Sequence, residues 1–187
     1  MSQPTFIPLL NSIAANEAKG EKLLKTWAEH TTDPQLKQCL EFVSIREGEH
    51  AWAFTKRMCE LGYAVDEENA YQVFKDFDGL LQCAASDATD AEKVAMLTGG
   101  NRAGDGETRD PFKGFFNDTS IDPQTGELLG RYIAEERDSG RRLKAEYDRV
   151  CAGKAANGNN AELAELTACV ASLQQEVGKL RKKLKKK

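Results

Sequence analysis

The sequence predicts an all-α protein: an antiparallel four-helix bundle followed by a C-terminal coiled-coil helix. Residues 5–30, 34–61 and 123–151 carry apolar side chains at alternating steps of three and four, the spacing of one face of an amphipathic helix. Residues 163–184 alternate strictly at three and four, which indicates about three heptads of coiled coil. These two patterns define the fold class.

The chain of 187 residues divides accordingly into three parts. We expect the helical bundle over residues 1–152, a flexible linker over 153–160 and a coiled-coil oligomerisation helix over 161–187. The part from residue 153 onward carries eight Lys or Arg and three Glu, a net charge of +5, which leaves −9 for residues 1–152. The basic tip can meet an acidic partner, but as the end of a coiled coil its simpler role is solubility. We expect no nucleic-acid partner.

The first helix, over residues 5–30, has one carboxylate in its apolar face. Its inward positions are Phe6, Leu10, Ile13, Glu17, Gly20, Leu24 and Trp27. Glu17 interrupts this face near its middle. A buried carboxylate must be paired, hydrogen-bonded or bound to a metal, so the position is a candidate site.

The second helix follows almost at once, because Asp33 can cap it and Pro34 can be its first residue. Its inward positions are Leu36, Leu40, Val43, Glu47, His50, Phe54 and Leu61. A connection this short makes the two helices an antiparallel hairpin. Glu17 and Glu47 lie equally far from Thr32, so at about 1.5 Å rise per residue they lie at the same height on facing helices.

The middle of the chain is less regular. We expect a third helix from about residue 67 to 85 and a shorter one over 90–97, followed by a glycine-rich loop over 99–111. The candidates here for a further acidic ligand, Asp78 and Glu92, are not assigned to the site. Three phenylalanines that can close one end of the core come next: Phe112, Phe115 and Phe116.

The fourth helix, over residues 123–151, repeats the Asp-Pro start with Asp122 and Pro123. Its inward positions are Leu129, Ile133, Glu136, Gly140, Leu143 and Tyr147. Glu136 is the third carboxylate that interrupts an apolar face, while its neighbour Glu135 is expected to point toward solvent or a helix flank.

The tail is predicted to join two copies of the chain. Valine at two a positions and leucine at every d position favour a parallel two-stranded assembly, a homodimer. Packing of the stripe back on the bundle and a higher oligomer are the alternatives. The apolar positions are Leu163, Leu166, Val170, Leu173, Val177, Leu180 and Leu184.

Three carboxylates and one imidazole on facing helices can bind a metal. Glu47 and His50 form a Glu-x-x-His pair, which puts two ligands on one helix face one turn apart. With Glu17 and Glu136 the set is rich in oxygen, which suits iron or manganese better than structural zinc. We predict one or two ions held by Glu17, Glu47, His50 and Glu136.

The arrangement of these residues resembles the metal-binding motif of the ferritin-like superfamily, in particular that of its rubrerythrin-type members. In that family a Glu on the first helix and a Glu-x-x-His on the second provide half of a di-iron site, the places taken here by Glu17, Glu47 and His50. The resemblance implies oxygen or peroxide chemistry at iron, or iron oxidation and storage. It also implies a second Glu-x-x-His on the fourth helix, but here Ser139 follows Glu136 at the matching position.

That departure keeps two functions open: an iron-dependent oxidoreductase, and a non-catalytic ferritin-like scaffold with a degenerate site, assembled through the coiled coil. The second requires the acids to be neutralised without metal, by arginines that lie nearby in the sequence: Arg46, Arg57, Arg137 and Arg141. The other histidine, His30, lies at the end of the first helix and is expected to be a polar terminal residue.

Targeting signals are not evident. The sequence has no run of eighteen apolar residues, and its first residues lack the basic start and cleavage site of a signal peptide. The five cysteines are scattered and never form a Cys-x-x-Cys pair. We expect a cytoplasmic protein with no membrane partner.

Overall fold

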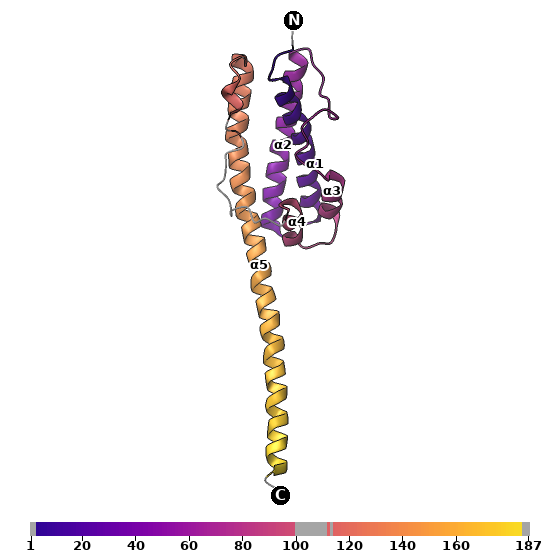
Figure 1. Cartoon of the computed structure of the whole chain (residues 1–187), viewed down its shortest axis with the longest axis vertical. Helices are drawn as coiled ribbons and strands as arrows, with labels where there is room; N and C mark the ends of the chain where they lie inside the picture. The colour runs from indigo at the N-terminus through magenta and orange to yellow at the C-terminus, as the bar shows by residue number, and fades with distance from the viewer. Residues whose placement is uncertain (1–2, 100–111, 113, 185–187) are drawn as a thin grey trace. The chain divides into compact units, whose positions relative to one another are not determined.

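The computed structural model describes the backbone of residues 3–99, 112 and 114–184, and the side chains of these residues up to 153. Within these ranges the chain is all-helical, with five α-helices, one 3₁₀ turn and no strand, as predicted (Figure 1). It forms two compact units, Met1–Tyr147 and Asp148–Lys187. None of the described helices is both long and apolar enough to cross a lipid bilayer.

Helices α1 (Ile7–His30) and α2 (Pro34–Glu60) form the predicted antiparallel hairpin. The Asp33 side chain accepts hydrogen bonds from the backbone N–H groups of Gln35 and Leu36, at 3.0 and 2.9 Å, which confirms the predicted N-cap. Every predicted inward position of α1 is buried, including Glu17 and Gly20. The periodicity therefore identified the face of α1 that packs against the rest of the unit.

The region after α2 differs from the prediction. The third helix, α3 (Phe77–Ala85), begins ten residues later than expected, because the Asp76 side chain caps it by accepting from the N–H of Gly79. α4 (Asp90–Leu97) forms as predicted and begins with a capping box of Thr89 and Glu92. α3 packs on α1, and α4 packs on α3.

The residues before α3 form an irregular strap over 66–73 that side chains of α1 hold in place. Asn11 exchanges two hydrogen bonds with the backbone of Asp66, at 2.8 and 2.7 Å. Ser12 accepts from the N–H of Tyr71, and Asn16 both donates to the carbonyl of Tyr71 and accepts from the N–H of Val73. Asn11 and Asn16 are buried, so these bonds satisfy polar groups that would otherwise be costly.

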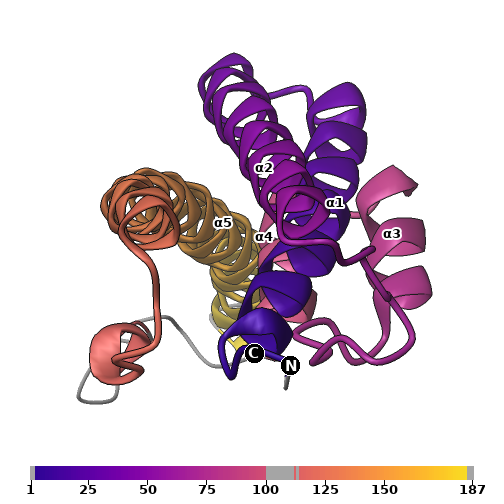
Figure 2. The ribbon, with the colours of Figure 1, turned by 90° about the horizontal axis from the view of Figure 1, so that it is seen from above.

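Helix α5 (Pro123–Leu184) spans both units and begins at the predicted Asp-Pro pair, where Asp122 accepts from two backbone N–H groups. Figure 2 shows its first part beside α2, with α3 on the other side of α1. The backbone of residues 153–160, the predicted linker, is helical as well. The side chains of the predicted coiled coil, from Leu163 to Leu184, lie outside the described residues.

The core of the first unit lies between α1, α2 and the beginning of α5. Phe112 and Phe115 pack against it from the 3₁₀ turn η1 (Phe115–Asn117) and the residues before it, as predicted, whereas Phe116 is 54% exposed. A turn of three residues sends successive side chains in different directions, so the three phenylalanines do not all reach the core. The buried residues of the cluster against which Phe112 and Phe115 pack are Phe6, Ile7, Leu10, Ile13, Ala14, Phe54, Met58, Leu129, Tyr132 and Ile133.

Candidate metal centre

Three of the four predicted ligands meet in the interior of the first unit. Glu17 from α1, His50 from α2 and Glu136 from α5 each offer one ligand atom, and these atoms all lie within 4.8 Å of one another. Glu17 and His50 are buried and Glu136 is partly buried. Helical periodicity placed each side chain inward. The hairpin register predicted Glu17 opposite Glu47, but the structure puts Gly20 opposite Glu47 and His50 beside Glu17, a shift of about one helical turn.

His50 is the centre of this group. Its Nδ1 atom lies 3.2 Å from Oε2 of Glu17 and 3.3 Å from Oε1 of Glu136. Its other ring nitrogen, Nε2, lies 2.8 Å from Oε2 of Glu135. Both ring nitrogens therefore face carboxylates, two at Nδ1 and one at Nε2.

Glu47, the fourth predicted ligand, lies beside this group. Its carboxylate occupies the space that the missing side chain of Gly20 leaves on α1: a Cβ atom at residue 20 would lie 2.4 Å from Oε2 of Glu47. Burial, with the negative charges of Glu17 and Glu136, raises the pKa of Glu47 to about 10. Its surroundings thus favour the protonated, neutral form of the carboxyl group.

Two residues of the site were not among the predicted ligands. The Tyr132 hydroxyl donates a hydrogen bond of 2.9 Å to Oε1 of Glu17, and the ring is buried against Phe54 and His50. Tyr132 lies one helical turn before Glu136, so the inward stripe of α5 contained the signal. Glu135 was expected to point toward solvent or a helix flank; it lies on the flank of α5, and from there its carboxylate reaches His50.

The charges around His50 favour its protonated form. Burial of the ring by itself lowers the pKa of His50, but the contacts with Glu136, Glu17 and Glu135 outweigh it and raise the pKa to about 10. Burial raises the pKa of Glu136, and burial with the charges of Glu17 and Glu136 raises that of Tyr132. Without a metal, the imidazolium is the cation that these acids surround.

Three of the four arginines named above pair with carboxylates outside the group, although the charge of Arg46 still acts on Glu136 and another arginine, Arg131, pairs with Glu135 at 3.1 Å. Arg46 pairs with Asp138 at 3.1 Å, and Arg141 contacts the same carboxylate at 3.4 Å. Arg57 pairs with Asp122 at 2.9 Å and with Glu60 at 3.1 Å. The ion pairs of Glu17 among the described residues involve His50 and no arginine.

One buried atom of the site lacks a hydrogen bond. Oε1 of Glu136 has no hydrogen-bond partner among the described residues, although His50 Nδ1 is 3.3 Å away. A buried carboxylate oxygen without a donor is costly. A metal ion between Nδ1 and the two carboxylates would satisfy it, so the residues present fit a metal of the oxygen-preferring kind.

His30, the second histidine of the chain, is placed as expected. Its Nδ1 atom lies 2.8 Å from the backbone carbonyl oxygen of Thr26, and the side chain is exposed at the end of α1. It is outside the candidate site.

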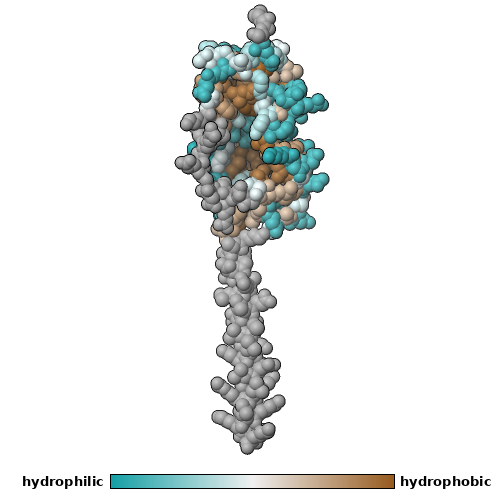
Figure 3. Space-filling view, in the orientation of Figure 1, coloured by the Kyte–Doolittle hydropathy of each residue, from teal (hydrophilic) through white to brown (hydrophobic). Residues whose placement is uncertain are grey.

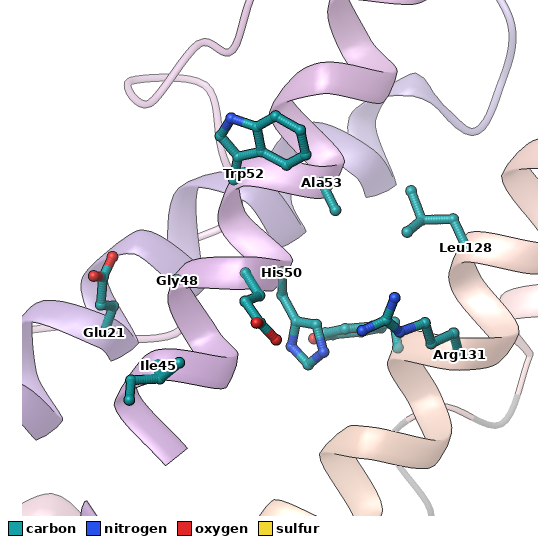
Figure 4. Close-up of a pocket in the computed structure, with 10 residues that line it drawn as sticks. Glu21, Ile45, Gly48, His50, Trp52, Ala53, Leu128 and Arg131 are labelled. Atoms are coloured by element: carbon teal, nitrogen blue, oxygen red, sulfur yellow. The ribbon is translucent and has the colours of Figure 1, made fainter. Parts of the chain in front are cut away.

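Two cavities reach the site from different sides. One, of about 590 Å³, is lined by His50 and Tyr132 together with polar and apolar side chains of α2 and α5; Figure 4 shows His50 pointing from α2 toward Arg131 of α5. The other, of about 630 Å³, ends at Glu17, Glu47 and Glu136 and has mostly apolar walls. Small molecules therefore have space on both sides of the buried group.

The fold and the site define an all-helical protein with a buried Glu–His–Glu group that can hold a metal ion. No protein family, curated protein or solved structure matches this chain.

Proposed function

We propose that this chain is a ferritin-like metal protein that binds one iron ion, or manganese, at Glu17, His50 and Glu136, with Glu47 beside them. The observation that carries the proposal is the meeting of three ligand atoms from three helices within 4.8 Å, with a buried carboxylate oxygen that accepts no hydrogen bond among the described residues. Bound iron would supply redox chemistry with oxygen or peroxide, so we propose oxidation of ferrous iron or reduction of oxygen or peroxide.

The chain's own residues have defined tasks in this proposal. Glu135 accepts from Nε2 of His50, which holds the ring so that Nδ1 faces the two acidic ligands. Tyr132 donates to one oxygen of Glu17 and leaves Oε2 turned toward His50. Glu17 and His50 are buried, which limits their contact with bulk water.

A second function is favoured by one observation: in this structure both nitrogens of His50 already have carboxylate partners. A protonated His50 can therefore tie α1, α2 and α5 together without any metal. The protein would then be a non-catalytic ferritin-like scaffold with a degenerate site, and the coiled coil would be its working part.

Metal analysis separates the two functions. We expect purified protein titrated with Fe²⁺ without oxygen to bind close to one ion per chain and to melt at a higher temperature. His50→Ala should abolish binding, and His30→Ala, the matched control at the chain's other histidine, should not change it. An unchanged melting temperature and no bound metal in the unaltered chain would favour the scaffold.

A further inference from the structure

We propose that the cavity of about 630 Å³ is a pocket for a small, neutral, ring-containing molecule with one hydroxyl group. As a substrate pocket it rests on the proposed function, because the cavity ends at the metal centre. As a binding site it rests on the cavity alone. Its volume lies in the range of pockets that bind small organic molecules.

The walls of the cavity suit an apolar ring. They include Leu9, Ile13, Val73, Phe74, Phe112 and Phe115. The Phe112 ring stands edge-on to Phe115 and to Tyr132, with ring centroids 5.5 and 5.9 Å apart. Aromatic side chains in such arrangements can stack on or stand edge-on to a further ring.

One wall of the cavity exposes apolar side chains to solvent, which is unfavourable unless a ligand covers them. The strap over 66–73 is fixed by Asn11, Ser12 and Asn16, and it leaves the side chains of Tyr71 and Val73 75% and 59% exposed. Both line the cavity, whose surface is largely apolar; Figure 3 shows apolar side chains open to solvent in this unit. A ring that filled the cavity would bury this surface.

The polar residues that line the cavity determine which polar group a ligand can carry. Glu17, Glu47, Glu136 and the Tyr132 hydroxyl lie there, so a hydroxyl group finds acceptors and a metal-bound position within reach. A pure hydrocarbon would leave these groups unmatched. An anion would meet carboxylates in a poorly solvated space, which is unfavourable.

The test is a calorimetric titration of the full chain with 2-naphthol as the probe. It is carried out once without metal and once with Mn²⁺. We expect saturable binding, and naphthalene-2-sulfonate should bind the metal-free chain about tenfold or more weakly because its charge cannot be buried. Val73→Asp should weaken 2-naphthol binding by about tenfold or more, since it places a charge in the apolar wall. Leu9→Trp should cause a similar loss by filling the cavity.

The matched control is Ile45→Asp. Ile45 is also an exposed aliphatic residue, 64% exposed, but it lines the other cavity. It should leave 2-naphthol binding unchanged. Absence of saturable binding in the unaltered chain, or equal losses in Val73→Asp and Ile45→Asp, would overturn the inference.

The same samples distinguish this inference from the proposed function. Metal uptake without 2-naphthol binding would overturn the pocket and leave the metal centre intact. Binding of 2-naphthol without metal uptake would support the pocket as a binding site and overturn both the metal centre and the pocket's role in supplying it with substrate.

Discussion

At the scale of single residues, the site depends on which side of the His50 ring each carboxylate occupies. Glu135 takes the Nε2 side, and Glu17 and Glu136 share the Nδ1 side. A metal-bound imidazole usually donates its second N–H to a carboxylate or carbonyl, which fixes the ring and the tautomer. Glu135 is therefore a positioning residue for the proposed centre.

We predict that Glu135→Ala lowers metal affinity by about 10- to 100-fold, because the ring loses the acceptor that orients it. Glu135→Gln keeps an acceptor oxygen and should lose less. Competition with a chelator measures both affinities. Glu127→Ala, at an exposed glutamate of the same helix, is the control, and an equal loss there would mean that the effect is not local.

At the scale of helices, the hairpin and its ligands could be predicted because local signals agree. The apolar steps and the Asp33 cap fix the inward faces of α1 and α2, and thus the inward positions of Glu17 and His50. The predicted heights are less accurate, because Glu47 lies opposite Gly20 and not opposite Glu17. The first residue of α3 could not be predicted from such local signals. Tyr71 and Val73, in the segment predicted to be the beginning of this helix, form hydrogen bonds with Asn16 of α1, and such tertiary contacts override the local helical pattern.

Glu135 was missed for a related reason. The sequence placed it beside the inward stripe of α5, and a helical position shows on which side a residue lies but not how far its side chain reaches. His50 extends from α2 toward α5, so Glu135 meets it from the flank of its own helix. The pairing depends on how α2 and α5 pack, which has no local signature.

The close approach of α1 and α2 at Gly20 gives a prediction for this pair of helices. Gly20→Ala would place a methyl group 2.4 Å from Oε2 of Glu47, so that side chain must move. Alanine is the better helix former by about 1 kcal/mol. Crowding of this kind costs about 1–3 kcal/mol, so we expect no gain in stability and weaker metal binding.

Gly130→Ala is the matched control. It lies in α5 with no atom within 4 Å of its added Cβ, so the variant should gain about 0.5–1 kcal/mol of stability and bind metal normally. Urea unfolding and metal titration of both variants measure the contrast. A gain at Gly20 as large as that at Gly130 would show that Glu47 is free to leave its place without cost.

The contact between α2 and the start of α5 gives a prediction about pH. Arg57 and the Thr125 hydroxyl both bind Oδ2 of Asp122, at 2.9 and 2.6 Å. The hydrogen bonds from Thr125, with the contact of Arg57, lower the pKa of Asp122 to about 2 from an ordinary value of 3.8. A lowered pKa means that the carboxylate stabilises the folded state above pH 3.8 and loses this effect as the pH falls through 2.

Asp122→Asn isolates this charge, because asparagine is also a good N-cap. The variant should melt at a lower temperature than the unaltered chain at pH 6, and the difference should shrink between about pH 4 and pH 2. Melting curves at a series of pH values measure it. A difference that stays constant down to pH 2 would show that the loss comes from the hydrogen bonds and not from the charge.

At the scale of the whole molecule, the candidate site and the predicted dimerisation segment fall in different units. All ligands come from Met1–Tyr147, whereas the heptads belong to Asp148–Lys187. We propose that the heptads form a parallel two-stranded coiled coil, because valine recurs at a and leucine at d. If so, assembly and metal binding are separable.

We therefore predict that the double variant Leu173→Asp, Val177→Asp is monomeric, since a charge at a or d positions of a coiled coil is buried without a partner. Gln175→Asp, at an outward f position of the same heptad, should leave the dimer intact. Light scattering after gel filtration gives the mass of each. Metal content and affinity should be the same in the monomeric variant, because Glu17, His50 and Glu136 already meet within one chain. A loss of metal that follows the loss of the dimer would mean that a second chain completes the site.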